Sequence, residues 1–325
     1  MGKIQRFKLK ELVVENEIKK ESNTEIKLEE YHILKNYLET EKKIKVTPSC
    51  HLEMDLGLDS LDKVSLQVFI ESGFGISMEI SEIVKFDNIL ALSEYLHNHK
   101  LRSRAEKVNW SEILRQKINL NLPSTWITGN IFVKISHLFF MVYFRFSGKG
   151  EMNIPNSPCI IVANHQSFFD GLFLASLLKF RQMRKTYFYA KEKHIRNPFV
   201  KFLANRNNII IMDLNHNLKE SIQKMAEVLR KKKNLIIFPE GTRTRDGKLG
   251  DFKKTFAILS RELNVPVVPV TIKGAFEALP RGSIFPKPFK LIRVEFHKPV
   301  FPENHSYESL SELVRSRIEG NLDRA

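Results

Sequence analysis

We expect from the sequence an all-α module at the front of the chain, followed by an α/β domain with a mainly parallel central sheet. The first observation is length, because 325 residues exceed the roughly 100–200 of one ordinary domain. The second is charge: residues 1–100 carry 14 Lys and Arg against 18 Asp and Glu, which leaves 38 against 19, a net of +19, for the rest. The third is a change of hydrophobic period near residue 100. An acidic module therefore precedes a basic one, and basic surfaces attract nucleic acid, anionic lipid or phosphorylated substrates.

The front module has its apolar residues at helical spacing. Three stretches show this pattern: residues 26–41, 60–71 and 87–96. No convincing strand pattern precedes Lys100. From residue 97 to 109 the chain turns polar and basic, which is typical of a linker.

Short apolar runs alternate with helical patterns in the rest of the chain. Six runs are predicted strands: residues 159–163, 186–190, 208–212, 235–238, 267–272 and 290–297. Four stretches are predicted helices: residues 171–180, 218–232, 252–264 and 306–318. Alternation of strand and helix favours an α/β domain with a mainly parallel sheet.

Residues 125–146 form the most apolar stretch of the chain and are long enough to cross a bilayer. Asn130, Lys134, His137 and Arg145 fall near one face of a helix drawn through it. A polar stripe opposite Trp and Phe favours a helix that lies in the membrane interface. The alternative is a buried core helix with a solvated edge.

Cysteine content and the N-terminus indicate the compartment. Cys50 and Cys159 cannot build a disulfide framework, and no Cys/His cluster predicts a metal site. The first residues lack the apolar core of a signal peptide. We expect a reducing compartment and therefore a cytoplasmic protein. Together with the interfacial helix, this predicts peripheral attachment to the inner face of the cell membrane.

Ser60 lies in the run DLGLDSLDKVSLQVFIESGFGI, at the start of a predicted helix. Asp and Ser are good helix N-caps, so capping alone would explain a DS pair. The whole run, however, resembles the acyl carrier protein family over about residues 25–100. An acidic face typical of such carriers is present at Asp55, Asp59, Asp62 and Glu71, with Lys63 as a departure.

The resemblance implies a four-helix carrier domain with 4′-phosphopantetheine bound covalently to Ser60. A phosphopantetheinyl transferase is then a partner. Free backbone N–H groups and the helix dipole at the start of a helix would favour the phosphodiester.

Asn164-His165-Gln166-Ser167-Phe168-Phe169-Asp170 follows a predicted strand. Ser167 and Asp170 have the spacing of a capping box. His165 and Asp170 would point roughly 140° apart on one continuous helix. They meet if His165 lies in the strand-to-helix turn and Asp170 in the first helical turn, where the carboxylate would orient the imidazole as a general base.

Phe238-Pro239-Glu240-Gly241-Thr242-Arg243 follows another predicted strand. The backbone amides of Gly241 and Thr242 can face an anion, and Arg243 can bind a phosphate through two hydrogen bonds. The alternative is a solvated basic turn.

The two segments together resemble the glycerolipid acyltransferases, which include 1-acylglycerol-3-phosphate acyltransferases, over about residues 125–300. The resemblance implies that His165 deprotonates the acceptor hydroxyl with Asp170 as partner. It also implies that Glu240, Gly241, Thr242 and Arg243 bind the acceptor phosphate. No nucleophile elbow of the GxSxG type is present, so direct attack on an acyl thioester is expected.

Two departures from that family stand out. Leu214 follows Asp213 where an arginine is usual, so Arg206, Lys191 or Arg245 would have to compensate, and the acceptor head group stays open. Thr255 replaces a glycine.

Residues 2–10 resemble the end of adenylate-forming acyl-CoA and acyl-carrier synthetases, with a separate acyl-carrier synthetase as an implied partner; a chance charge run is the alternative. The predicted organisation is a leader (1–24), an acyl carrier domain (25–100), a linker (101–124) and an acyltransferase domain (125–325). The expected activity is acyl transfer from a thioester, on Ser60, on acyl carrier protein or on acyl-CoA, to a lysophospholipid hydroxyl at a membrane surface.

Two other functions compete with this one. A non-catalytic acyl carrier or docking scaffold anchored to the membrane would need neither His165 nor Asp170. Nucleic-acid binding would account for the basic second half, but no RNA-recognition, zinc-finger or helix-turn-helix pattern is present. We therefore expect no nucleic-acid partner.

Overall fold

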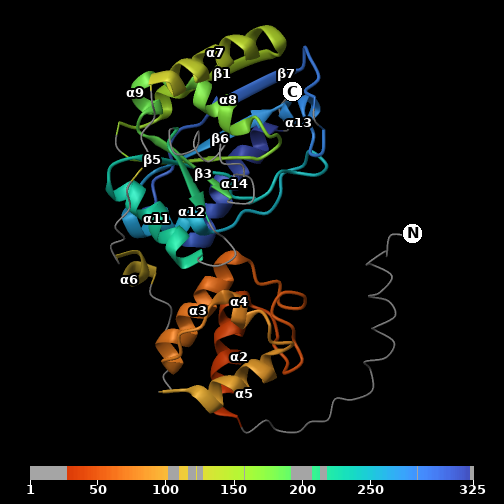
Figure 1. Cartoon of the computed structure of the whole chain (residues 1–325), viewed down its shortest axis with the longest axis vertical. Coiled ribbons are helices and arrows are strands. Elements are labelled where there is room, and N and C mark those ends of the chain that lie inside the picture. Colours follow the sequence, from red (N-terminus) through yellow and green to blue (C-terminus); the bar gives the residue numbers. More distant parts are fainter. Residues whose placement is uncertain are drawn as a thin grey trace, which may run out of the picture. The chain divides into compact units, whose positions relative to one another are not determined.

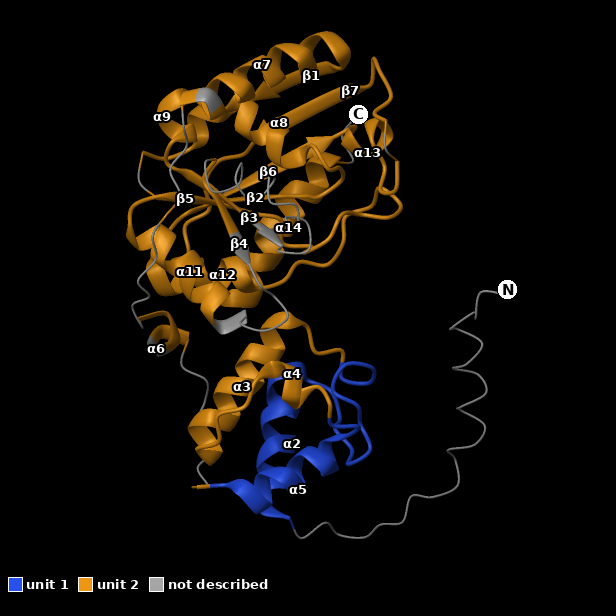
Figure 2. Cartoon of the chain, in the orientation of Figure 1, with its two compact units in different colours: residues 1–56, 86–100 blue, residues 57–85, 101–325 orange. Residues whose placement is uncertain are grey.

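The computed structural model describes residues 28–101, 110–115, 122, 127–156, 158–191, 207–212, 218–283 and 285–322. The chain divides into two compact units, residues 1–56 with 86–100 and residues 57–85 with 101–325 (Figure 2). The division falls within the helical front region. The predicted leader and most of the predicted linker lie outside the described residues.

The first unit is built on two helices, α2 (Glu29–Lys42) and α5 (Ile89–His99), which pack against each other. Both were predicted. Asn88 begins α5 by accepting a hydrogen bond from the amide of Ala91 at 2.9 Å. The carboxylate of Glu30 is buried and accepts hydrogen bonds from Lys100 Nζ and, at 3.0 Å, from His97 Nδ1.

The second unit begins with α3 (Ser60–Phe74) and the short helix α4 (Ile80–Ile83). Gln67 Nε2 donates to the carbonyl of Met78 at 2.7 Å and so joins α3 to the segment before α4. The sequence predicted α3 but not α4, because one helical turn gives too few positions for a period. Within residues 28–101 the structure contains helices and no strand, as expected.

The rest of the second unit is an α/β domain around a seven-stranded sheet (Figure 1). The strands are β1 (Arg145–Lys149), β2 (Ile160–Ala163), β3 (Thr186–Lys191), β4 (Ile209–Met212), β5 (Asn234–Ile237), β6 (Val267–Lys273) and β7 (Leu291–Phe296). Their order is β1-β7-β6-β2-β5-β3-β4, and every neighbouring pair is parallel except β6 with β7. The prediction of a mainly parallel sheet is confirmed.

Helices cover both faces of this sheet (Figure 1). One face is packed by α11 (Leu218–Arg230), α12 (Thr255–Leu263) and α14 (Tyr307–Leu322), the other by α7 (Ile127–Tyr143) and α8 (Asp170–Leu177). Alternate residues of β2 serve the two cores: Ile160 and Val162 face the first set of helices, Ile161 and Ala163 the second. This is the period of two that a strand requires. The described residues of this unit also form the short helices α6 (Trp110–Arg115), η1 (Glu151–Asn153), α9 (Phe180–Met183) and α13 (Ala275–Ala278).

Six of the seven strands coincide with predicted ones to within a residue or two. The exception is β1, whose first two residues the sequence assigned to the apolar helix. Arg145 therefore lies on a strand that pairs with β7, not on the polar face of a helix, and that part of the prediction was wrong.

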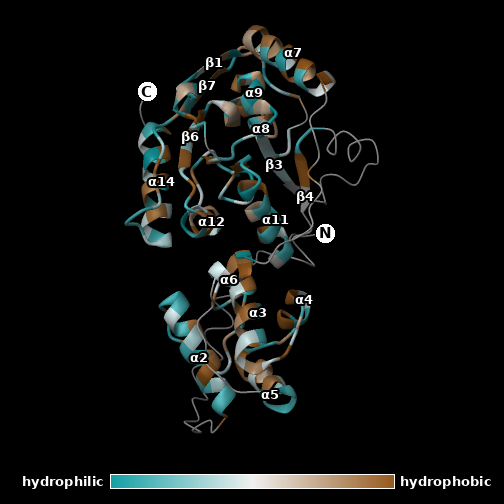
Figure 3. Ribbon diagram, turned by 90° about the vertical axis from the view of Figure 1, so that its left-hand side faces the viewer, coloured by the Kyte–Doolittle hydropathy of each residue, from teal (hydrophilic) through white to brown (hydrophobic). Residues whose placement is uncertain are grey.

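The helix α7 is not a core helix with a solvated polar edge, because its polar face packs against the domain and its apolar face is exposed. Its polar residues point toward the domain: Asn130 is buried, and Lys134 Nζ donates to the carbonyls of Ser176 and Leu178 at 3.1 and 2.9 Å. His137 Nδ1 lies 3.3 Å from Ser176 Oγ. Large apolar side chains are exposed instead, at Ile127, Ile131, Phe132, Ile135, Leu138, Phe139, Met141 and Val142. Figure 3 shows brown, hydrophobic residues recurring along this helix.

Among the described helices, none has the length and apolar character needed to cross a membrane. The 17 residues of α7 fall short of the roughly 20 that a bilayer requires.

Candidate active site

The two segments singled out by sequence meet at one edge of the sheet. His165 follows β2 and Glu240 follows β5, and these strands are parallel neighbours. Because the carboxyl ends of parallel strands lie at the same edge, the two loops are brought together there. The sequence alone could not predict this meeting, because it depends on β2 and β5 being neighbours in the sheet.

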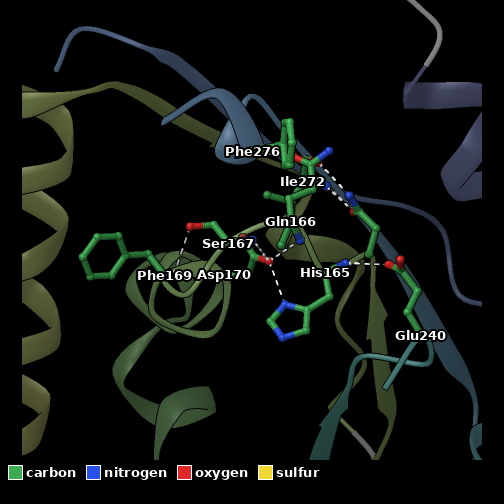
Figure 4. A network of polar contacts seen from close by, with 9 residues as sticks. His165, Gln166, Ser167, Phe169, Asp170, Glu240, Ile272 and Phe276 are labelled. Atoms are coloured by element: carbon green, nitrogen blue, oxygen red, sulfur yellow. Dashed lines mark hydrogen bonds and ion pairs between the residues drawn. The ribbon is translucent and has the colours of Figure 1, made fainter. Parts of the chain in front are cut away.

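His165 and Asp170 are in contact, as predicted (Figure 4). The helix α8 begins at Asp170, so His165 lies in the preceding turn. His165 Nδ1 lies 2.9 Å from Asp170 Oδ2, and the same oxygen accepts the amides of Gln166 and Ser167 at 2.6 and 2.7 Å. The capping box forms only in part, because Ser167 Oγ accepts from the amide of Phe169, at 3.4 Å, instead of closing on Asp170.

The two residues differ in exposure. The His165 side chain is 23% exposed and that of Asp170 is fully buried, so a substrate can reach the imidazole but not the carboxylate. Burial raises the pKa of Asp170, while hydrogen bonds from His165 and the two amides act in the opposite direction. The imidazole also stacks on Phe238, with ring centroids 4.3 Å apart, which limits its rotation.

Glu240 joins the two loops through their backbones. Its Oε1 accepts from the amide of His165 at 2.7 Å and its Oε2 from the amide of Gly250 at 3.0 Å. Burial raises the pKa of Glu240, and the two amides oppose that shift. Thr244 adds a second link, since its amide donates to the carbonyl of His165 at 2.8 Å. The carboxylate of Glu240 thus holds the loop of His165 in place.

The turn after Glu240 is tight. Gly241 has a φ of +70°, and its amide donates to the carbonyl of Phe238 at 3.0 Å, so the expectation that this amide faces an anion was wrong. Thr242 is exposed and Arg243 is half-buried. Arg281 Nη1 donates to Thr242 Oγ1 at 3.4 Å, which brings a second guanidinium to the turn.

Asn164 is a further site residue, and the sequence pattern predicted no role for it. Its side chain is buried and makes two hydrogen bonds with Ile272 of β6, donating to the carbonyl at 2.9 Å and accepting from the amide at 2.8 Å. The residue before His165 is thereby fixed to the neighbouring strand. The signal that could have identified Asn164 was its position directly after a predicted strand and before His165.

Ser60 is the first residue of α3. Asp59 caps the helix by accepting the amides of Leu61 and Asp62 at 2.7 and 3.0 Å. These two amides are therefore not free for an anion, contrary to our expectation. The Ser60 hydroxyl is half-buried and accepts a hydrogen bond from Lys253 Nζ at 3.2 Å.

The two departures from the family pattern have different outcomes. Thr255 is the first residue of α12, and its φ is not positive, so the backbone does not require a glycine there. Arg206 and Leu214 lie outside the described residues, and so does the side chain of Lys191, whereas Arg245 is exposed. Within the residues that the structure describes, no group of three or more His, Cys, Asp or Glu side chains is arranged to hold a metal ion.

Comparison with known proteins agrees with both motifs. Residues 145–273 match the family model described as Acyltransferase, and residues 34–96 match the one described as Phosphopantetheine attachment site. A phosphopantetheine attachment domain thus precedes an acyltransferase domain.

Relatives of the acyltransferase domain carry consistent names. The chloroplastic 1-acyl-sn-glycerol-3-phosphate acyltransferase of Brassica napus is 32% identical over 56% of this chain and 52% of its own length. The 1-acyl-sn-glycerol-3-phosphate acyltransferase of Pseudomonas aeruginosa is 30% identical over 39% of this chain and 48% of its own. This chain spans about half the length of the curated relatives it matches.

The fold agrees as well. The crystal structure of the 1-acyl-sn-glycerophosphate acyltransferase PlsC from Thermotoga maritima superimposes with a TM-score of 0.51 at 29% identity. The match covers 60% of this chain and 77% of that one.

Proposed function

We propose that this chain is an O-acyltransferase that moves a fatty acyl group from a thioester to the free hydroxyl of 1-acylglycerol-3-phosphate or a related lysophospholipid. The observation that carries the proposal is the hydrogen bond between His165 and Asp170 at a partly exposed imidazole. The relatives are named as acyltransferases of 1-acyl-sn-glycerol-3-phosphate, and a general base would promote attack of a hydroxyl on a thioester.

His165 acts as the general base in this reaction. Because Nδ1 faces Asp170, Nε2 takes the proton of the acceptor hydroxyl while that oxygen attacks the thioester carbonyl. The new C–O bond forms, the C–S bond breaks, and the proton passes from Nε2 to the departing thiolate. Asp170 holds the imidazole in the required tautomer and stabilises the imidazolium.

The turn after β5 binds the acceptor phosphate. Arg243 offers a guanidinium and Thr242 a hydroxyl, and Arg281 adds a second positive charge through its bond to Thr242. Glu240 and Gly241 shape this turn, since their polar groups are bonded within the protein.

Ser60 is the attachment residue for phosphopantetheine. Its hydroxyl stands at a helix start beside the Lys253 ammonium, a favourable neighbour for a phosphodiester. When bound, the group supplies a terminal thiol on a flexible arm. A phosphopantetheinyl transferase would attach it, a separate acyl-carrier synthetase would charge it, and acyl carrier protein or acyl-CoA are the other donors.

The acyltransferase domain attaches peripherally to a membrane through α7. The exposed apolar stripe of this helix suits a position in the headgroup region, where the acceptor lipid resides. In the cell we expect the inner face of the cell membrane.

The test uses the full chain with phosphopantetheine on Ser60 and the thiol acylated. Lysophosphatidic acid and lysophosphatidylethanolamine are supplied together, and diacyl products are followed by mass spectrometry. His165→Ala removes the base, with His305→Ala as the matched control. Ser60→Ala, assayed with acyl-CoA, separates the choice of donor from the chemistry.

Diacyl product from one acceptor, lost in His165→Ala and kept in His305→Ala, supports the proposal and identifies the head group. Absence of product from both acceptors and both donors contradicts it and favours a non-catalytic acyl carrier or docking scaffold.

A further inference from the structure

The segment Phe285–Lys290, called here the 285–290 loop, has an unusual composition for a surface connection. It reads Phe-Pro-Lys-Pro-Phe-Lys and precedes β7. Phe285 is 83% exposed and Phe289 74% exposed, and both lysines are exposed. A single exposed aromatic residue needs no explanation, but two such residues alternating with two lysines on one short loop form an apolar and basic surface together.

The backbone of this loop is strained at Phe289, which has a φ of +58°. Bulky side chains rarely adopt this left-handed conformation, and strain of this kind is often kept where it serves a function. Burial of the ring does not offset the strain, because the ring is exposed. Pro286 and Pro288 stiffen the same segment, so the two rings are held outward at little entropic cost on binding.

Two hydrogen bonds fix the loop to the last residue of α7, and a third fixes it to the first residue of β1. Tyr143 Oη donates to the carbonyl of Pro286 at 2.8 Å, and the amide of Phe289 donates to the carbonyl of Tyr143 at 2.8 Å. The amide of Arg145 donates to the carbonyl of Lys290 at 2.9 Å. In Figure 1 the chain before β7 rises beside one end of α7. The two aromatic rings therefore lie next to the helix that carries the exposed apolar stripe.

A basic cavity of about 520 Å³ opens at the base of the loop. Its lining includes three lysines, Lys248, Lys287 and Lys290, and two acidic residues, Asp246 and Glu277. Phe276 forms part of the wall, and its amide donates to Gln166 Oε1 at 3.4 Å. The excess of positive charge suits a phosphate-bearing head group, and the cavity borders the loop that carries His165.

We propose that the 285–290 loop docks on an anionic phospholipid bilayer, with Phe285 and Phe289 in the headgroup region and Lys287 and Lys290 on lipid phosphates. A bilayer fits better than an acidic protein, because the surface continues into the apolar stripe of α7, which only an extended apolar phase would cover. The inference deepens the proposed peripheral attachment and adds a preference for anionic lipid that α7, with its apolar outer face, does not explain.

The test is co-sedimentation of the full chain with vesicles of phosphatidylcholine alone or with 30% phosphatidylglycerol. The Lys287→Gln/Lys290→Gln chain should lose about tenfold or more in affinity for the anionic vesicles only. The Phe285→Ser/Phe289→Asn chain should bind both kinds about tenfold more weakly. Asparagine tolerates a positive φ, so this variant should keep or gain stability. Lys298→Gln and Phe301→Ser are the matched controls and should bind like the unaltered chain.

A second measurement reports the insertion of the loop into vesicles directly and does not depend on a change in affinity. Phe285→Trp should show a blue shift of its emission on addition of anionic vesicles, whereas Phe301→Trp should not. Vesicle binding that is unchanged in both double variants, with no shift at position 285, would overturn the proposal and assign the loop to a protein partner. Neither readout involves turnover, so both can be made in a His165→Ala chain, and an inactive enzyme would leave this test intact.

Discussion

Asp170 Oδ2 lies 2.9 Å from His165 Nδ1 and accepts two backbone amides as well. Three donors on a single buried oxygen favour the carboxylate over the neutral acid, against the burial that raises the pKa of Asp170. Asp170 Oδ1 has no partner in the described structure. The arrangement therefore orients one imidazole nitrogen and leaves the other for the substrate.

Asp170→Asn should lower kcat by about 10²–10⁴-fold, because an amide nitrogen cannot accept the His165 proton and the imidazole loses its tautomer. The measurement is single-turnover acyl transfer to whichever lysolipid the competition experiment identifies as acceptor, with circular dichroism to verify folding. Asp251→Asn, an exposed carboxylate on the same domain, is the control. A rate within threefold of the unaltered chain would show that His165 works without this partner.

Glu240 predicts a pH dependence of stability. Burial raises the pKa of Glu240 above 4.5, so the folded state holds its proton to higher pH than the unfolded state. The contribution of this group to stability is therefore greatest in acid and declines as pH rises from about 4.5 through the raised pKa.

Glu240→Gln removes this titration. The free energy of unfolding of the unaltered chain minus that of the variant should decrease as the pH rises from 4 to 7. Urea denaturation of both chains at several pH values gives this difference directly. A difference that is constant, or that grows with pH, would contradict the assigned burial.

Much of the site could be predicted because it is local in sequence. Asp170 lies five positions after His165, and a strand-to-helix turn suffices to join them. The role of Glu240 could not be predicted, because its partners are the backbone amides of His165 and Gly250, and amides leave no signature in residue type. The expectation of free amides beside Ser60 was wrong for a related reason. Asp59 was recognised as a helix cap, but residue type does not show that its side chain accepts the amides of both Leu61 and Asp62.

The orientation of α7 shows a second limit. Periodicity placed Asn130, Lys134 and His137 on one polar face of the helix but could not say whether that face packs against the domain. Lys134 decides the matter by donating to carbonyls at the end of α8, where a helix carries partial negative charge. Only the position of α8 reveals this.

Asn164→Ala should destabilise the domain by roughly 2–4 kcal/mol, because it leaves a buried amide and a buried carbonyl of Ile272 without partners. Chemical denaturation of the full chain, followed in the second unit by tryptophan emission, measures the change. Asn264 and Asn304 are unsuitable controls, because their φ values of +50° and +65° would strain an alanine. Ser309→Ala serves as the control instead.

A loss of stability below about 0.5 kcal/mol in Asn164→Ala would mean that water replaces the hydrogen bonds of this side chain.

The exposed stripe of α7 gives the last prediction. Ile131→Gln, Ile135→Gln and Leu138→Gln together remove three large apolar side chains that touch solvent. Because interfacial binding scales with buried apolar area, affinity for phosphatidylcholine vesicles should fall by at least about a hundredfold. The fold should survive, since the buried face of the helix, with Val133 and Phe140, is unchanged. Met54→Gln, an exposed methionine of the first unit, is the control. Activity on lysolipid presented in vesicles should fall in parallel with binding; if binding persists while activity falls, the stripe instead contributes to the acyl-binding surface.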